Sequence, residues 1–257
     1  MFKWFLIMIA TFGFNYAFAN SHPIIISGYD DVLKQADNTG LIKSIVKFFD
    51  EDKTFAGMPE LFNVINQGRT NSTQFYLVSG TSSWFDNQID IFLTANNFPP
   101  RKIFLRNWLV EWSNVDFKIK KIKMILNSGP AESFIVIIDN SSASLEIAET
   151  INKIAYPKVL AVYLRKIKKG LVPSGATPFT TAFDIALAEY KENRLNLRDT
   201  LLVGRAVLTN ADDEKVLPAY ADCPVNYQPC QAAASEFLLV CKGLQERITR
   251  ICKNRAN

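Results

Sequence analysis

Residues 23–31, PIIISGYDD, decide the fold of this chain. The first half of the stretch is a continuous apolar string, and the second half is a glycine, a tyrosine and two carboxylates. A continuous apolar string is typical of a strand buried on both faces of a parallel sheet. The polar residues would then follow the carboxyl end of the strand, which is where open α/β sheets bind their ligands.

Four similar apolar runs follow and alternate with helical patterns. The apolar runs lie at residues 75–79, 102–106, 134–139 and 159–164, and the helical patterns lie near residues 41–49, 59–67, 84–96, 118–127 and 145–154. This alternation predicts a doubly wound α/β domain. Polar residues that could take part in chemistry end two further runs, at Asp139-Asn140-Ser141-Ser142 and at Ser79-Gly80-Thr81.

The strand pattern stops after Gly170, and the rest of the chain has helical periodicity. Two amphipathic segments lead to a PAYADCPVNYQPC loop and then to a helical pattern near residues 233–255. We therefore predict an α/β domain at residues 20–170 and a helical, disulfide-clipped extension at residues 171–257.

The first 19 residues have the pattern of a secretory signal peptide. Lys3 precedes an apolar segment that closes with Ala17-Phe18-Ala19, and the segment is shorter than a membrane span, which needs about 20 residues. We expect cleavage after Ala19 and export to a periplasm or to the extracellular space.

The four cysteines fit an oxidising compartment. Cys223, Cys230, Cys241 and Cys252 all lie in the C-terminal part of the chain. Cys241 and Cys252 share a helical face but lie about 16 Å apart, which is too far for a bond between them. A loop that folds back would pair Cys223 with Cys252 and Cys230 with Cys241. The alternative is a Cys223–Cys230 bridge with two free thiols, and a zinc site is less favoured because no CxxC occurs.

The charge balance does not favour nucleic acid as a partner. The formal net charge is +4, and removal of Lys3 lowers it to +3, whereas nucleic-acid binding usually needs a strongly basic face. Two basic clusters, at residues 118–123 and 165–169, could contact anionic lipid head groups at a membrane surface, although solvated helix and loop charges are the favoured explanation. For Trp84, a core or helix-capping role is favoured over membrane contact.

Six segments carry a family resemblance: YDDVLK (29–34), TFAGMPELF (54–62), FYLVSGTSSWF (75–85), FPPRKIFLR (98–106), FIVIIDNSSASLEI (134–147) and VLAVYLRKI (159–167). Their order resembles the catalytic domain of the actin-patch-associated phosphatidate phosphatases, in the haloacid dehalogenase (HAD) superfamily. The resemblance covers about residues 24–168 and implies a HAD-like fold. The C-terminal cysteine region is not part of it.

The resemblance implies a catalytic aspartate at the position that Gly28 occupies. The family's first motif is DxDD[TV], in which the first aspartate attacks phosphorus and the second acts as general acid and base. Aligned on Asp30-Asp31-Val32, the nucleophile position falls on Gly28, and Asp30 keeps the acid/base position. Asp31 is a poor substitute nucleophile, because successive residues of an extended strand point to opposite sides.

The resemblance also implies roles for residues of three later segments. Ser79 takes the position of the hydroxyl that contacts the phosphoryl group, and Lys118 that of the phosphate-neutralising lysine, with Lys120 or Lys121 as alternatives. Asp139 takes the position of a Mg²⁺ ligand, whereas Ser144 replaces a second acid. With Gly28 and Ser144 in place of carboxylates, we expect Mg²⁺ to bind weakly. A different interpretation makes Asp30, Asp31 and Asp139 turn or helix-capping acids.

Our leading hypothesis is a catalytically degenerate phosphatase that binds a phosphorylated or lipid ligand, or a protein partner. One alternative is a working Mg²⁺-dependent phosphatase that acts on phosphatidate or another phosphomonoester, with water attacking directly and Asp30 as the base. A second alternative is a protein-interaction module. The sequence therefore leaves open whether the chain is an enzyme.

Overall fold

The computed structural model describes residues 22–36, 53–68, 73–128, 132–154, 158–230 and 235–256. The predicted signal peptide and the helix expected near residues 41–49 lie outside these ranges. Within them, no helix combines the length and the apolar character that crossing a bilayer requires.

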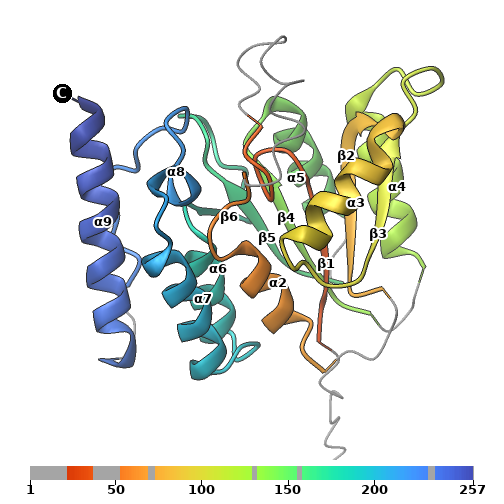
Figure 1. Cartoon of the computed structure of the whole chain (residues 1–257). Coiled ribbons are helices and arrows are strands. Elements are labelled where there is room, and N and C mark those ends of the chain that lie inside the picture. Colours follow the sequence, from red (N-terminus) through yellow and green to blue (C-terminus); the bar gives the residue numbers. More distant parts are fainter. Residues whose placement is uncertain are drawn as a thin grey trace, which may run out of the picture.

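A six-stranded parallel sheet forms the centre of the molecule (Figure 1). Its strands are β1 (Ile24–Ser27), β2 (Phe75–Ser82), β3 (Arg101–Arg106), β4 (Phe134–Asp139), β5 (Val159–Arg165) and β6 (Ala176–Phe179), in the order β3-β2-β1-β4-β5-β6. β1 pairs with β2 on one side and with β4 on the other. The strand order therefore reverses between β1 and β4, which confirms the predicted doubly wound α/β fold.

The sixth strand corrects the expectation that strands end before Gly170. β6 adds to β5 at the edge of the sheet, in a register that pairs Leu164 with Pro178. The strand has only four residues, and its proline cannot donate a hydrogen bond, which restricts it to an edge. The segment consequently lacks the long apolar run that identified the other strands.

Helices cover both faces of the sheet. The helices in the described ranges are α2 (Met58–Ile65), α3 (Asp86–Ala95), α4 (Asn114–Leu126), α5 (Ser142–Ile154), α6 (Ala182–Lys191), α7 (Leu197–Thr209), α8 (Asp213–Val216) and α9 (Leu238–Ala256), with short 3-10 turns η1 (Ser83–Phe85) and η2 (Ser235–Phe237). The last of them, α9, packs against α7. Ile24 and Ile26 of β1 pack with α4 and α5, whereas Ile25 packs in the larger core with α2, α3, α6, α7 and α9. The apolar string of β1 is thus buried on both faces, as predicted.

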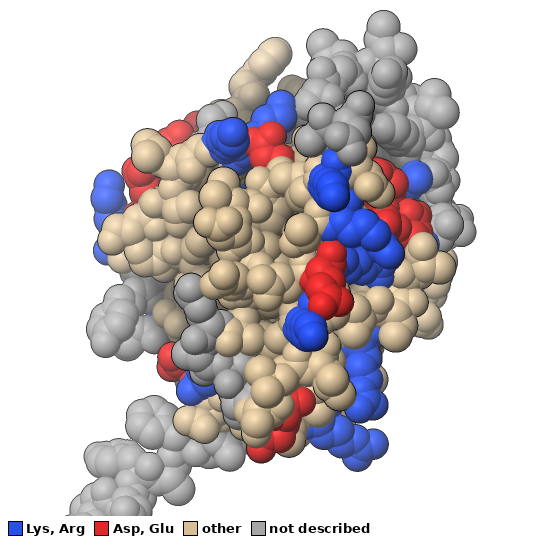
Figure 2. Space-filling view, turned by 90° about the vertical axis from the view of Figure 1, so that its left-hand side faces the viewer, with Lys and Arg blue, Asp and Glu red and all other residues tan. Residues whose placement is uncertain are grey.

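Two disulfides attach the segment between α8 and α9 to helix α9. The bonded pairs are Cys223–Cys252 and Cys230–Cys241, with Cα–Cα distances of 5.7 Å and 5.8 Å. Of the two arrangements that the sequence left open, the structure has the nested pairs and not the Cys223–Cys230 bridge. Figure 2 shows the side of the molecule where α9 lies, with charged side chains bordering a broad uncharged area.

The C-terminal helices share their core with the sheet domain. Phe237 of η2 lies 6.2 Å from the ring of Phe183 and 4.9 Å from the ring of Tyr190, both on α6, and Phe237 belongs to the same buried cluster as Ile25. The segment is therefore packed on the α/β core.

We predict that both disulfides stabilise the folded chain and that the longer loop contributes more. The Cys223–Cys252 bridge closes a separation of 29 residues and the Cys230–Cys241 bridge one of 11. Cys223→Ser with Cys252→Ser should lower the free energy of unfolding in urea by about 3.5 kcal/mol, and Cys230→Ser with Cys241→Ser by about 3 kcal/mol. An unchanged unfolding midpoint in the first pair of variants would contradict the prediction.

Candidate functional site

A pocket of about 560 Å³ opens at the carboxyl ends of β1, β2 and β4. This is the edge of the sheet at which the strand order reverses, where doubly wound folds bind their ligands. The polar groups that line it include Gly28, Asp30, Ser79, Thr81, Asn114, Lys118, Asp139, Asn140, Ser144, Lys168 and Tyr220. The structure therefore brings together the predicted site residues Gly28, Asp30, Ser79, Lys118, Asp139 and Ser144.

Gly28 is the first residue after β1. Its backbone N–H donates to the carbonyl of Ile137 in β4 at 3.0 Å, so Gly28 continues the pairing of β1 with β4. A Cβ added at Gly28 would lie 3.2 Å from a methyl group of Val32 and 4.0 Å from the carbonyl oxygen of Ile137. A side chain would thus fit after a small shift of Val32, so the backbone does not require glycine here.

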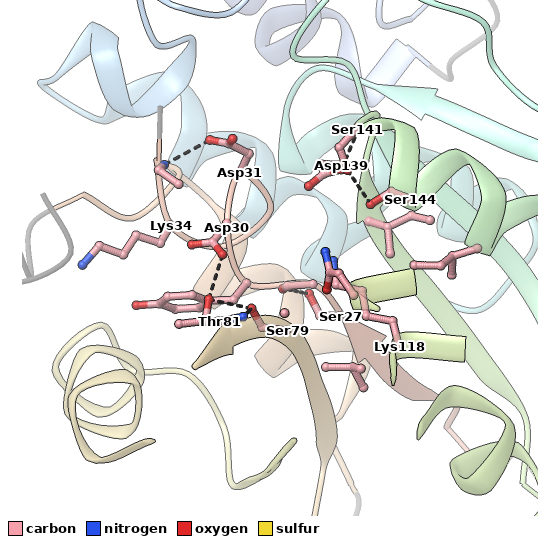
Figure 3. Close-up of a pocket in the computed structure, with 18 of the residues that line it drawn as sticks. Ser27, Asp30, Asp31, Lys34, Ser79, Thr81, Lys118, Asp139, Ser141 and Ser144 are labelled. Atoms are coloured by element: carbon pink, nitrogen blue, oxygen red, sulfur yellow. Dashed lines mark hydrogen bonds between the residues drawn. The ribbon is translucent and has the colours of Figure 1, made fainter. Parts of the chain in front are cut away.

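Asp30 is held by a short chain of hydroxyl groups (Figure 3). Thr81 donates from Oγ1 to Oδ2 of Asp30 at 3.0 Å, and Ser79 donates from Oγ to Oγ1 of Thr81 at 2.9 Å. The backbone N–H of Thr81 also donates to Ser79 Oγ at 3.2 Å. The sequence predicted Ser79 and Asp30 as separate groups, and Thr81 is the residue that connects them.

The surroundings of Asp30 favour its protonated form. Burial raises the pKa of Asp30 to about 6, and the negative charges of Asp31 and Asp139 act in the same direction. The hydrogen bond from Thr81 and the positive charge of Lys118 oppose this shift and only partly offset it. A carboxyl group with a pKa near 6 is suited to proton transfer near neutral pH.

Asp31 belongs to a different set of contacts. Its backbone is left-handed, with φ of 55°, and its carboxylate accepts hydrogen bonds from Tyr220 Oη at 2.6 Å and from the backbone N–H of Ala36 at 3.0 Å. These hydrogen bonds make the Asp31 carboxylate part of the turn after β1. Tyr220 was not predicted for the site, because it lies 189 residues away in the chain and no local pattern marks it.

Lys118 reaches the pocket from α4, whereas its two alternatives do not line it. Lys120 is exposed, and the ammonium group of Lys121 lies over the rings of Phe104 and Phe117. The choice of Lys118 among the three lysines therefore agrees with the structure.

The first turn of α4 brings a second polar group to the pocket. Asn114 begins the helix, and its buried Oδ1 has no hydrogen-bond partner. The Asn114 amide lies so close to Gly80 that a Cβ at Gly80 would be 1.9 Å from this oxygen. Asn114 and Lys118 thus face the pocket from the positive end of the helix dipole, which favours anions.

The loop after β4 supplies few ligands for a metal ion. Oδ1 of Asp139 accepts from the backbone N–H of Ser141 at 2.8 Å, and the hydroxyl of Ser141 donates to that of Ser144 at 3.1 Å. Among the described residues, no three His, Cys, Asp or Glu side chains are grouped as metal ligands. Mg²⁺ requires near-octahedral oxygen ligands, so a donor set with Asp139 and serine hydroxyls fits it poorly.

Two expectations about the surface need correction. Arg165, which the sequence grouped with a basic surface cluster, is only 2% exposed and lies between the rings of Phe55 and Phe179. Trp84, for which a core or capping role was favoured, is 71% exposed. Both errors arise because chain neighbours at a strand end or in a short turn point in different directions.

We predict that Asp30→Asn stabilises the protein at high pH. The pKa of Asp30 rises from 3.8 to about 6 on folding, so the contribution of this group is fully present below pH 4 and is lost as the pH rises through 6. At pH 8 the free energy of unfolding of the variant should be about 2 kcal/mol higher than that of the parent. This is less than the full pKa shift implies, because Asp30 is partly exposed. At pH 4 the difference should vanish.

Urea unfolding at the two pH values measures this difference. Glu149→Gln on the exposed side of α5 is the control and should leave the unfolding free energy near that of the parent. Equal stabilities of the parent and Asp30→Asn at pH 8 would show that Asp30 is not disfavoured as an anion.

The comparison with protein families agrees with this geometry. The family model of the phosphatidate phosphatase APP1 catalytic domain matches residues 24–166, more than half of the chain. No curated protein and no solved structure matches the chain significantly. The matched range runs from β1 through β5 and contains the pocket apart from Ile167, Lys168 and Tyr220. The chain belongs to the family of the phosphatidate phosphatase APP1 catalytic domain, within the HAD superfamily.

Proposed function

We propose that this chain is an exported, catalytically degenerate member of its family, which binds a phosphorylated or lipid ligand without efficient turnover. The observation that carries the proposal is Gly28, which stands where the family's motif has its nucleophilic aspartate. The signal-peptide pattern and the two disulfides support export. The family supports a phospholipid as the ligand.

The groups that would hold a phosphate are retained. Lys118 supplies a positive charge, and the hydroxyl of Ser79 lines the same pocket. The Oδ1 of Asn114 has no hydrogen-bond partner, so rotation of the side-chain amide can turn its NH2 group toward a phosphate. Backbone N–H groups at the start of a helix add to the attraction for an anion. These groups support phosphate binding in a pocket that Asp30 and Asp139 also line.

The groups that would carry out the covalent step are incomplete. An aspartyl-phosphate intermediate needs a carboxylate in line with phosphorus, and Gly28 has no side chain. Asp31 cannot replace it, because its carboxylate accepts hydrogen bonds from Tyr220 and Ala36. The retained acid/base group, Asp30, consequently has no nucleophile to assist.

A second candidate function is slow hydrolysis by water. The specific observation in its favour is the pKa of Asp30, near 6, which suits a general base. Direct attack would have to proceed with the lysines of the pocket, Lys34, Lys118 and Lys168, as the positive charge beside the phosphate. We therefore rank this function below binding without turnover.

We predict that Gly28→Asp gains phosphatase activity. The parent should release no phosphate above background from a short-chain phosphatidate in the presence of Mg²⁺. Gly28→Asp should release it at least about tenfold faster than the parent, a change of about 1.4 kcal/mol in the barrier. Addition of Asp30→Asn to this variant should remove the gain, because the leaving group then has no proton donor.

Gly28→Ala is the matched control, since it adds the Cβ next to Val32 without a carboxylate. It should remain as inactive as the parent. If the parent itself releases phosphate and Asp30→Asn stops it, the chain is an active phosphatase and the proposal is wrong.

We also predict that Lys118→Ala weakens ligand binding. Loss of a charge-assisted hydrogen bond should raise the dissociation constant for short-chain phosphatidate roughly tenfold. Isothermal titration calorimetry measures this, and Lys120→Ala, on the exposed side of the same helix, is the control that should bind like the parent. Equal weakening in both variants would place the ligand outside the pocket.

A further inference from the structure

The loop between β3 and α4 exposes several large apolar side chains. Leu109, Val110 and Trp112 are 71%, 69% and 87% exposed. The 3-10 turn η1 contacts β3, and its Trp84 is 71% exposed. Exposed apolar residues that occur singly are normal, but several neighbouring ones indicate an interaction site.

Hydrogen bonds hold this loop in a defined shape. The carbonyl of Asn107 accepts from the N–H groups of Val110 at 3.1 Å and Glu111 at 2.8 Å. The side chain of Asn107 accepts from the N–H of Leu109 at 3.0 Å, and the carboxylate of Glu111 accepts from the N–H of Asn107 at 2.9 Å. The turn therefore presents Leu109, Val110 and Trp112 outward in a fixed arrangement.

Trp108 joins the loop to the pocket. Its indole Nε1 donates to the carbonyl of Gly80 at 3.0 Å, and the guanidinium of Arg106 lies 5.5 Å from its ring. Trp108 is also one of the residues that line the pocket. The apolar loop thus stands at the mouth of the pocket, at the same end of the sheet as the loops after β1 and β4 (Figure 1).

We propose that residues 107–112 form an interfacial anchor that inserts into the head-group region of an anionic phospholipid bilayer. Trp112 has the amphipathic ring that is enriched at membrane interfaces, and Leu109 and Val110 supply apolar area. Lys118 and Lys168, which line the adjoining pocket, complement anionic lipid. The assignment of a lipid to the pocket rests on the proposed function. Insertion of the loop into a bilayer does not depend on a ligand in the pocket.

The charge and position of the loop favour a lipid over a protein partner. The guanidinium of Arg106 donates to the backbone carbonyl of Trp112 at 3.3 Å and lies over the ring of Trp108. Glu111, the one acid of the loop, uses its carboxylate within the turn. A bilayer offers both the apolar interior and the phosphates that these groups match. Insertion would bring a lipid head group to the pocket without removing the lipid from the membrane.

Vesicle flotation with the full exported chain tests the inference. The probes are phosphatidylcholine vesicles with and without phosphatidylglycerol, and neither contains phosphatidate. The parent should bind the anionic vesicles more strongly. Leu109→Ala with Trp112→Ala should lower the partition coefficient at least about tenfold, because two apolar side chains leave the bilayer. Both residues are exposed, so the variant should keep the thermal unfolding midpoint of the parent.

A control variant and a second binding measurement separate this inference from the proposed function. Leu239→Ala, which alters an 86% exposed leucine on α9, should float like the parent. The loop variant should bind soluble short-chain phosphatidate like the parent, because Leu109 and Trp112 do not line the pocket. If the loop variant binds soluble phosphatidate but no longer floats, the loop acts as an anchor whether or not the pocket turns substrate over.

Four results would overturn the inference. The loop variant could float like the parent, or Leu239→Ala could lose as much binding as the loop variant. The parent could bind neutral and anionic vesicles equally, which contradicts the electrostatic contribution. If the parent bound neither vesicle, the apolar loop would instead fit a protein partner.

Discussion

The parallel pairing of β1 with β4 determines where this molecule can bind a ligand. Because β1 lies between β2 and β4, the loops that leave β1 and β4 diverge and open a pocket above the sheet. The hydrogen bond from Gly28 N–H to the Ile137 carbonyl continues this pairing by one residue beyond β1. It places Gly28 in the lining of the pocket together with Asp30 and with Asp139, the last residue of β4.

The second half of the chain fixes the turn that carries Asp30. The guanidinium of Arg165 donates to the carbonyls of Val32 and Thr180, at 3.3 Å and 3.0 Å, and so joins the turn after β1 to the loop after β6. Burial lowers the pKa of Arg165 to about 9, so the group keeps its charge at neutral pH near Asp31 and Asp184. Tyr220 completes the arrangement through Asp31, which makes the C-terminal segment a structural part of the site.

The sequence predicted the parts of the fold that depend on local patterns. The five apolar strands follow from periodicity, whereas the pocket positions of Gly28, Asp30, Ser79, Lys118 and Asp139 follow from the family resemblance. Helical spacing excluded a Cys241–Cys252 bond but left the pairing of the cysteines open. It did not predict β6, whose four residues include a proline, or the burial of Arg165, which depends on aromatic rings from β6 and from the segment before α2. Tyr220 and Asn114 were missed because only tertiary packing brings them to the pocket.

In the proposed function, the pocket keeps its affinity for phosphate while Gly28 removes turnover. A ³¹P NMR time course of short-chain phosphatidate with the unaltered protein and Mg²⁺ tests both halves together, since bound lipid and free phosphate give different signals. We predict a shifted or broadened lipid signal that persists, with no growing signal of inorganic phosphate. A growing phosphate signal in proportion to protein concentration would contradict the loss of turnover, and an unperturbed lipid signal would contradict binding.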